Sequence, residues 1–104
     1  MKIIKSYIIE YIGTFALVYT ILSFQQQIVY EAILSGIVLA ILLYFAKKNL
    51  DVYVYPTFNP AVTLSHYLKG ELNLHQFIIY SIIELFAGYS VYFVKNYHLI
   101  KKII

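Results

Sequence analysis

Asn59 and Pro60 are the residues whose types and spacing suggest chemistry most directly. Asparagine is a favoured N-cap of helices, and proline fits the first helical position because that position needs no backbone N–H. The pair predicts a helix that begins at Pro60 and ends near Leu68, which is about half the length needed to cross a bilayer. If this helix begins at membrane depth, its free N–H groups and partial positive charge make it a candidate solute site. The alternative is a surface loop followed by an interfacial helix.

Two glutamates, Glu10 and Glu84, fall inside long apolar runs. An acid within a membrane is costly unless it is paired, so such residues usually serve as functional groups or structural anchors. The three histidines have neither metal-ligand spacing nor a Ser or Asp partner, and there is no cysteine. For His66, on the short helix, packing is favoured over gating. We therefore expect no catalytic residue, no metal, no cofactor and no enzyme.

The elements that carry these residues are strongly apolar. Of the 104 residues, 62% are hydrophobic and 12% are charged, against about 45–50% and about 25% in soluble domains. The excess lies in three runs, at about residues 7–24, 28–46 and 77–94, each near the length of a transmembrane helix. Composition and length predict a small all-α integral membrane protein in which residues 1–104 form one unit. They argue against a soluble enzyme.

The ends of the apolar runs are marked by lysines rather than by a basic patch, so no nucleic-acid partner is expected. Lys2 and Lys5 resemble the start of a signal peptide, but Glu10 and the glutamines after Phe24 favour a retained transmembrane helix. Three spans would place five lysines on one side and three on the other: Lys2, Lys5, Lys47, Lys48 and Lys69 against Lys95, Lys101 and Lys102. This bias is weak under the positive-inside rule, and it permits both orientations.

Three small residues, Ala32, Gly36 and Ala40, recur at a spacing of four in the second run. Small residues at this spacing let helix backbones approach closely in lipid. We expect this face to pack tightly against another helix, although small residues are common enough in such helices for the spacing to arise by chance.

The chain resembles the aquaporin (major intrinsic protein) family. Residues 58–64, Phe-Asn-Pro-Ala-Val-Thr-Leu, are similar to the family's first Asn-Pro-Ala box, and residues 10–19 are similar to its opening Glu and Gly-Thr pattern. Tyr80–Gly88 resembles the third helix, and the order of span, span, box and span also agrees. The resemblance covers nearly the whole chain but only one of the family's two inverted repeats.

The resemblance implies three transmembrane helices plus one re-entrant half-helix at about residues 52–68. It implies a passive channel for water or small uncharged solutes, completed in the bilayer by a second copy in the opposite orientation or by a complementary half-channel. Asn59 would donate hydrogen bonds to the solute, while two helix N-termini would disfavour cations. The pore residues implied are Thr57, Phe58, Asn59, Pro60, Ala61, Val62 and Ser35. The structural residues implied are Glu10 and Glu84, which would hold the loop, and Gly13, which would pack.

Several departures from the family pattern bear on selectivity. The chain has no arginine, whereas the family's filter uses one after its second box; here Val62 follows the box. Residues 54–57 lack the family's glycine and contain Pro56. The contribution of the second helix is Ser35 or Leu39, depending on the alignment. A non-conducting membrane scaffold and a hetero-oligomeric subunit therefore remain as alternatives to a homomeric channel.

Overall fold

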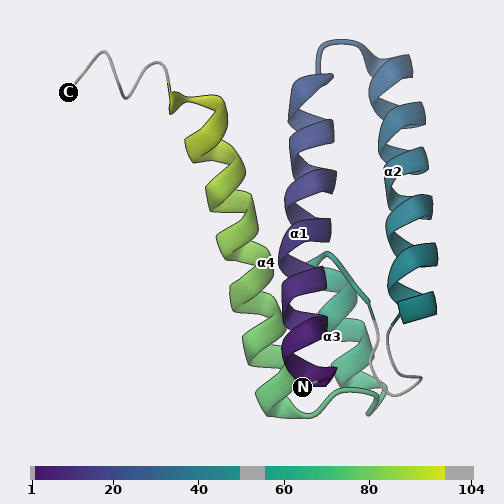
Figure 1. The fold of residues 1–104 in the computed structure, drawn as a ribbon, viewed down its shortest axis with the longest axis vertical. Coiled ribbons are helices and arrows are strands. Elements are labelled where there is room, and N and C mark those ends of the chain that lie inside the picture. The colour runs from purple at the N-terminus through teal and green to yellow at the C-terminus, as the bar shows by residue number, and fades with distance from the viewer. Residues whose placement is uncertain (1, 50–55, 98–104) are drawn as a thin grey trace.

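The computed structural model describes residues 2–49 and 56–97, which form four helices. These are α1 (Lys2–Ser23), α2 (Ile28–Asn49), α3 (Pro60–Leu68) and α4 (Leu74–Lys95) (Figure 1). No strand occurs within these two ranges, so the expected all-α fold is confirmed. The first part of the predicted 52–68 segment and His98 lie outside the described residues.

Helices α1, α2 and α4 are each long and apolar enough to cross a membrane, judged by length and composition. Each has 22 residues: α1 and α2 extend beyond the predicted runs at their lysine-bearing ends, and α4 begins three residues earlier than predicted. Many large apolar side chains on these helices are exposed, including Ile37 and Ile41 on α2 and Phe86 on α4. A single chain leaves this surface uncovered, which suggests a membrane protein.

The best-packed pair of helices is α1 and α4, which run in the same direction. Tyr7 on α1 meets Tyr80 on α4 edge to face, at 5.5 Å between ring centroids. Farther along both helices, the Tyr11 hydroxyl donates a hydrogen bond to Ser90 Oγ at 2.8 Å. Helix α2 returns antiparallel beside α1 and buries only Ala46 among its residues (Figure 1).

Helix α3 is short because polar signals fix both of its ends. Asn59 caps the N-terminus by accepting a hydrogen bond from the Ala61 N–H, and Pro60 follows as the first helical residue, as predicted. At the other end Gly70 has φ 82°, and its N–H donates to the Tyr67 carbonyl while the Glu71 N–H donates to that of His66. These bonds form a Schellman motif, which favours glycine at the left-handed position.

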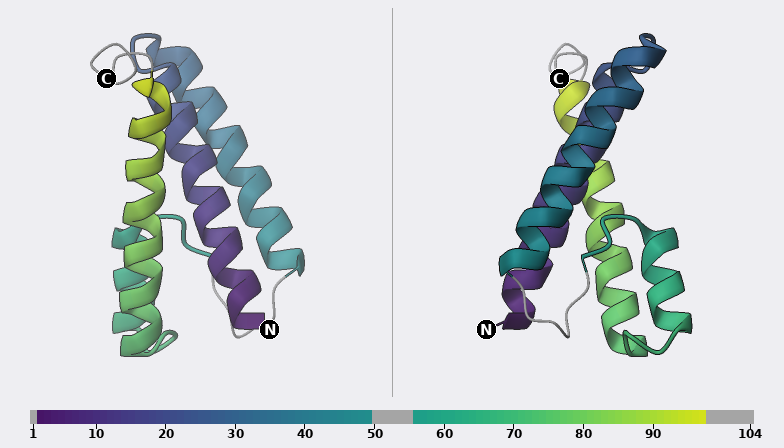
Figure 2. Two further views of the ribbon diagram at one scale, coloured as in Figure 1. Left: turned by 60° about the vertical axis from the view of Figure 1, so that its left-hand side comes forward. Right: turned by 90° about the vertical axis from the view of Figure 1, so that its right-hand side faces the viewer.

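Among the described helices, α3 packs only against α4. It begins beside the middle of α4 and runs toward the end at which α4 starts (Figure 2). Asn73 then caps α4 through a capping box with Gln76, which starts the long helix directly after the turn. The chain thus forms a helical hairpin of α3 and α4 beside the hairpin of α1 and α2.

The small-residue face of α2 does not contact another helix. Ala32, Gly36 and Ala40 are exposed, and a Cβ added at Gly36 would meet nothing within 4 Å. The expected tight packing of this face is therefore not made within residues 2–49 and 56–97.

Candidate functional site

Glu10, on α1, holds the segment that leads into α3. Its two carboxylate oxygens accept hydrogen bonds from the backbone N–H groups of Thr57 and Phe58, at 2.6 and 2.9 Å. Glu10 is 1% exposed. Two N–H donors on one carboxylate satisfy backbone groups that would otherwise be buried without partners. This is the contact that the sequence resemblance implied for Glu10.

Glu84, on α4, holds the same segment from the opposite side. Its carboxyl oxygen Oε2 lies 2.6 Å from Thr57 Oγ1, and its Oε1 lies 2.8 Å from Thr63 Oγ1. The two threonine hydroxyls are 2.7 Å apart. Thr57 precedes α3 and Thr63 lies within it, so Glu84 joins the loop and the short helix to the middle of α4.

Glu10 and Glu84 share one buried cluster of oxygen atoms. Thr57 Oγ1 also lies 3.2 Å from Glu10, and Thr63 Oγ1 lies 3.0 Å from the Asn59 carbonyl. Thr63 Oγ1 also lies 3.0 Å from Glu84 Oε2, so each threonine hydroxyl has several oxygen neighbours. The cluster therefore joins α1, the segment before α3, α3 itself and α4 through two buried carboxyl groups.

Phe58 adopts a backbone conformation that needs tertiary support. Its φ is 60°, in the left-handed region that residues with a Cβ seldom enter. Its side chain is 2% exposed and its ring lies against Gly13, where an added Cβ would overlap the ring atoms. Gly13 therefore packs against Phe58, and this contact together with the Glu10 bond holds the turn.

Asn59 lies at the surface, directly after the buried segment that Glu10 and Glu84 hold. Its Oδ1 accepts the Ala61 N–H at 2.8 Å, and the residue is exposed. Ala61 and Val62 are also exposed and Pro60 is half-buried. Thr57 and Phe58 are instead buried.

A groove of about 270 Å³ runs between α2 and the start of α3. Leu39 and Leu43 form its α2 wall, Val62 and His66 form its α3 wall, and Lys47 stands at one end. Ser35 is not among the lining residues, whereas Leu39 lines the groove together with Val62. Ser35 Oγ is shielded and has no hydrogen-bond partner in the part of the chain that the structure describes.

A charged turn follows α3 below this groove. Glu71 Oε1 lies 3.1 Å from His66 Nδ1 and 3.4 Å from Lys69 Nζ. Desolvation acts to raise the pKa of Glu71, but the hydrogen bonds and charges of Lys69 and His66 outweigh it and hold that pKa below its usual range. The ion pairs tie the turn to the last turn of α3.

Sequence reasoning missed the contributions of Thr63 and of the Thr57 side chain. The cluster they form depends on α1, α4 and the loop meeting in space. The only signal along the chain was the presence of two acids and two threonines in apolar surroundings. No cluster of three or more potential metal ligands occurs among the described residues.

No protein-family model, curated protein or solved structure matches the chain. A functional assignment therefore has to be argued from the geometry of the site and from the motif in residues 58–64.

Proposed function

We propose that the chain is a subunit of an aquaporin-like passive channel for water or small uncharged solutes. In this proposal α1, α2 and α4 cross the membrane, and α3 is a re-entrant half-helix. A single chain cannot enclose a pore with three spans, so the channel is formed by oligomerisation of half-length chains in antiparallel pairs.

The observation that carries the proposal is the position of Asn59 beside the middle of α4. Glu84 is the eleventh of the 22 residues of α4, which places it about 15 Å from either end at 1.5 Å per residue. Thr63 joins Glu84 to the Asn59 carbonyl. A helix N-terminus in the middle of a bilayer is stable only beside a water-filled cavity or a protein partner.

The orientation of Asn59 supports passage of a neutral molecule. Since its Oδ1 already accepts the Ala61 N–H, the NH2 group is the part of the amide that is left to donate to what passes. A water or alcohol oxygen would accept this bond and regain part of its lost hydration. The partial positive charge at the start of α3 disfavours cations at the same point. Leu39 and Val62 would provide an apolar wall.

A second copy in the opposite orientation would complete the site. It would bring a second α3 N-terminus and a second Asn59 to mid-membrane. The exposed surfaces of Asn59 and Ala61 and the uncovered α2 face are available for this contact. The lipid bilayer and a second chain are thus the partners in this proposal, with a complementary half-channel as the alternative partner.

The central test is the osmotic permeability of proteoliposomes that contain only this chain. We expect faster shrinkage than in empty vesicles, and we expect Asn59→Asp to remove most of the increase. Aspartate keeps the capping oxygen but replaces the donor with a negative charge. Stopped-flow light scattering gives both rates at equal protein density.

Asn73→Asp is the matched control for this test. Asn73 also caps a helix, through a bond to the Gln76 N–H, but it lies at the exposed start of α4. Its substitution should leave permeability unchanged. Wild-type shrinkage no faster than that of empty vesicles would exclude a homomeric water channel and would favour a scaffold or a hetero-oligomer.

Orientation can be tested separately because the chain has no cysteine. A single cysteine added at one end should react with an impermeant thiol reagent in about half of the molecules in intact vesicles or cells. Labelling of all molecules or of none would exclude antiparallel pairing.

A further inference from the structure

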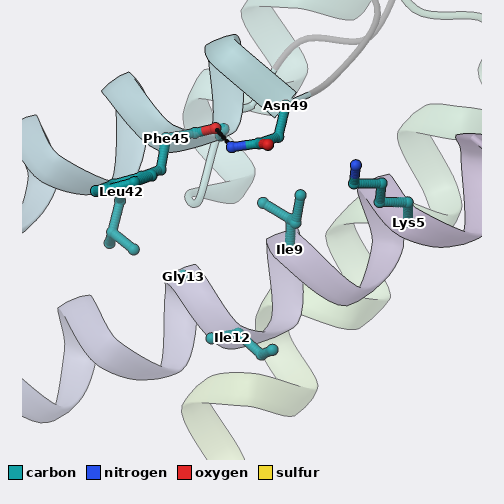
Figure 3. Close-up of a pocket in the computed structure, with 8 residues that line it drawn as sticks. Lys5, Ile9, Ile12, Gly13, Leu42, Phe45 and Asn49 are labelled. Carbon is teal, nitrogen blue, oxygen red and sulfur yellow. Dashed lines mark hydrogen bonds between the residues drawn. The ribbon is translucent and has the colours of Figure 1, made fainter.

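A second groove, of about 290 Å³, lies between α1 and α2, and Gly13 is one of the residues that line it. Ile9 and Ile12 form its α1 wall, and Leu42 and Phe45 form its α2 wall (Figure 3). Its volume is about twice the roughly 150 Å³ of an apolar cavity that binds benzene. Because both helices are candidate membrane spans, an apolar hydrocarbon chain fits this groove.

The polar residues of the groove stand together at one end. Lys5 on α1 and Asn49 on α2 lie beside each other there, whereas the rest of the lining is apolar (Figure 3). Asn49 donates its Nδ2 hydrogen bond to the Phe45 carbonyl at 2.8 Å. Lys5 is exposed and forms no ion pair with any acid in residues 2–49 or 56–97. A cation at the end of an apolar groove is complementary to an anionic headgroup above an acyl chain.

The position of Lys5 is not explained by helix stability. It lies near the N-terminus of α1, where a positive charge opposes the helix dipole, and the first turn has no acidic residue. Lys47 and Lys48, in contrast, lie in the last turn of α2, where positive charge is favourable. An anion bound at Lys5 would be stabilised by the lysine and by the start of α1 together.

We propose that the groove between α1 and α2 binds a phospholipid with an anionic headgroup. One acyl chain lies between Ile9, Ile12, Leu42 and Phe45, and the headgroup phosphate is held by Lys5, with Lys47 and Lys48 adding positive charge at the same end. Basic pockets between membrane helices bind anionic lipid headgroups in this way. The site does not depend on solute conduction, so it can be tested independently of the proposed function.

Native mass spectrometry of the full chain in detergent tests the site with two probes, phosphatidylglycerol and phosphatidylcholine, that have the same acyl chains. We expect preferential retention of phosphatidylglycerol. Lys5→Gln should lower its binding roughly fivefold, the effect of one basic residue near an anionic surface. Lys5→Arg should preserve it. Lys95→Gln, the same charge change at the far end of α4, should leave it unchanged.

Leu42→Trp tests the groove itself, because the larger side chain fills the space for the acyl chain. We expect it to lower retention of both lipids, and we expect glycerol phosphate, which has no acyl chain, not to compete. The proposal is overturned if Lys5→Gln and Lys95→Gln have equal effects, or if both lipids are retained equally. It is also overturned if Leu42→Trp changes neither. Far-UV circular dichroism establishes that each variant keeps its helices.

Discussion

At the scale of single residues, the carboxyl groups of Glu10 and Glu84 have different hydrogen-bond partners. Glu10 accepts two backbone N–H groups, whereas Glu84 contacts the hydroxyls of Thr57 and Thr63. We therefore expect Glu84→Gln to be nearly neutral, because a neutral amide can donate to Thr57 and accept from Thr63. Glu10→Gln should lower the free energy of unfolding by about 1–3 kcal/mol, since its NH2 group would leave a buried N–H unpaired.

Thermal unfolding of both variants in one detergent measures this difference. If Glu84→Gln is as destabilising as Glu10→Gln, the proposed difference between the two carboxyl groups is wrong. Leu85→Gln, next to Glu84 but on the exposed face, controls for the addition of an amide to α4.

The residues of the site differ in how far the sequence could predict them. The Asn59 cap and Pro60 follow from local rules, because a cap and a first helical residue act on their own neighbours. The left-handed turn at Phe58 could not be predicted, since it depends on the contact between its ring and Gly13 on a distant helix. Nor could the sequence decide between Ser35 and Leu39, because that choice depends on the rotation of α2 relative to α3.

At the scale of elements, the turn between α3 and α4 has a pH dependence of known sign. Lys69 and His66 hold the pKa of Glu71 below its usual range, so the unfolded chain binds this proton more readily than the folded one. The stabilisation is present above the unfolded pKa of about 4.3. It is lost as the pH falls through the lower folded value.

This dependence can be measured as the difference in thermal unfolding between wild type and Glu71→Gln. The wild type should be slightly more stable at pH 6, and the difference should shrink as the pH falls below about 4. The effect is small because Glu71 is solvent-accessible. A difference that grows toward acidic pH would contradict the sign.

The boundaries of the elements could be predicted well wherever polar residues mark them. Pro60 and Gly70 fix α3, and the glutamines after Phe24 separate α1 from α2. The pairing of the helices could not be predicted, because the apolar runs are hydrophobic on all sides. The small-residue face of α2 illustrates this: its spacing predicts close packing, but its three small residues are exposed among the residues that the structure describes.

At the scale of the whole molecule, antiparallel pairing makes a prediction about contacts between copies. If two α3 N-termini meet at mid-membrane, Ala61 of one copy lies near the axis that relates the two. Ala61→Cys should then form a disulfide-linked dimer on mild oxidation in vesicles, because bridged cysteines need Cβ atoms about 3.5–4.5 Å apart. Non-reducing gel electrophoresis gives the dimer fraction.

Leu85→Cys is the matched control for this crosslink, since Leu85 is 66% exposed and lies next to Glu84 at the same depth. In the proposed pair, Leu85 lies on the side of α4 that faces away from the axis between the two copies. Leu85→Cys should therefore crosslink far less than Ala61→Cys. Random collision in the membrane would link both positions equally, and a scaffold that assembles through α4 would link Leu85→Cys alone. Dimers at Ala61→Cys alone, together with labelling of about half of the molecules, would place the two Asn59 side chains together at the centre of an antiparallel pair.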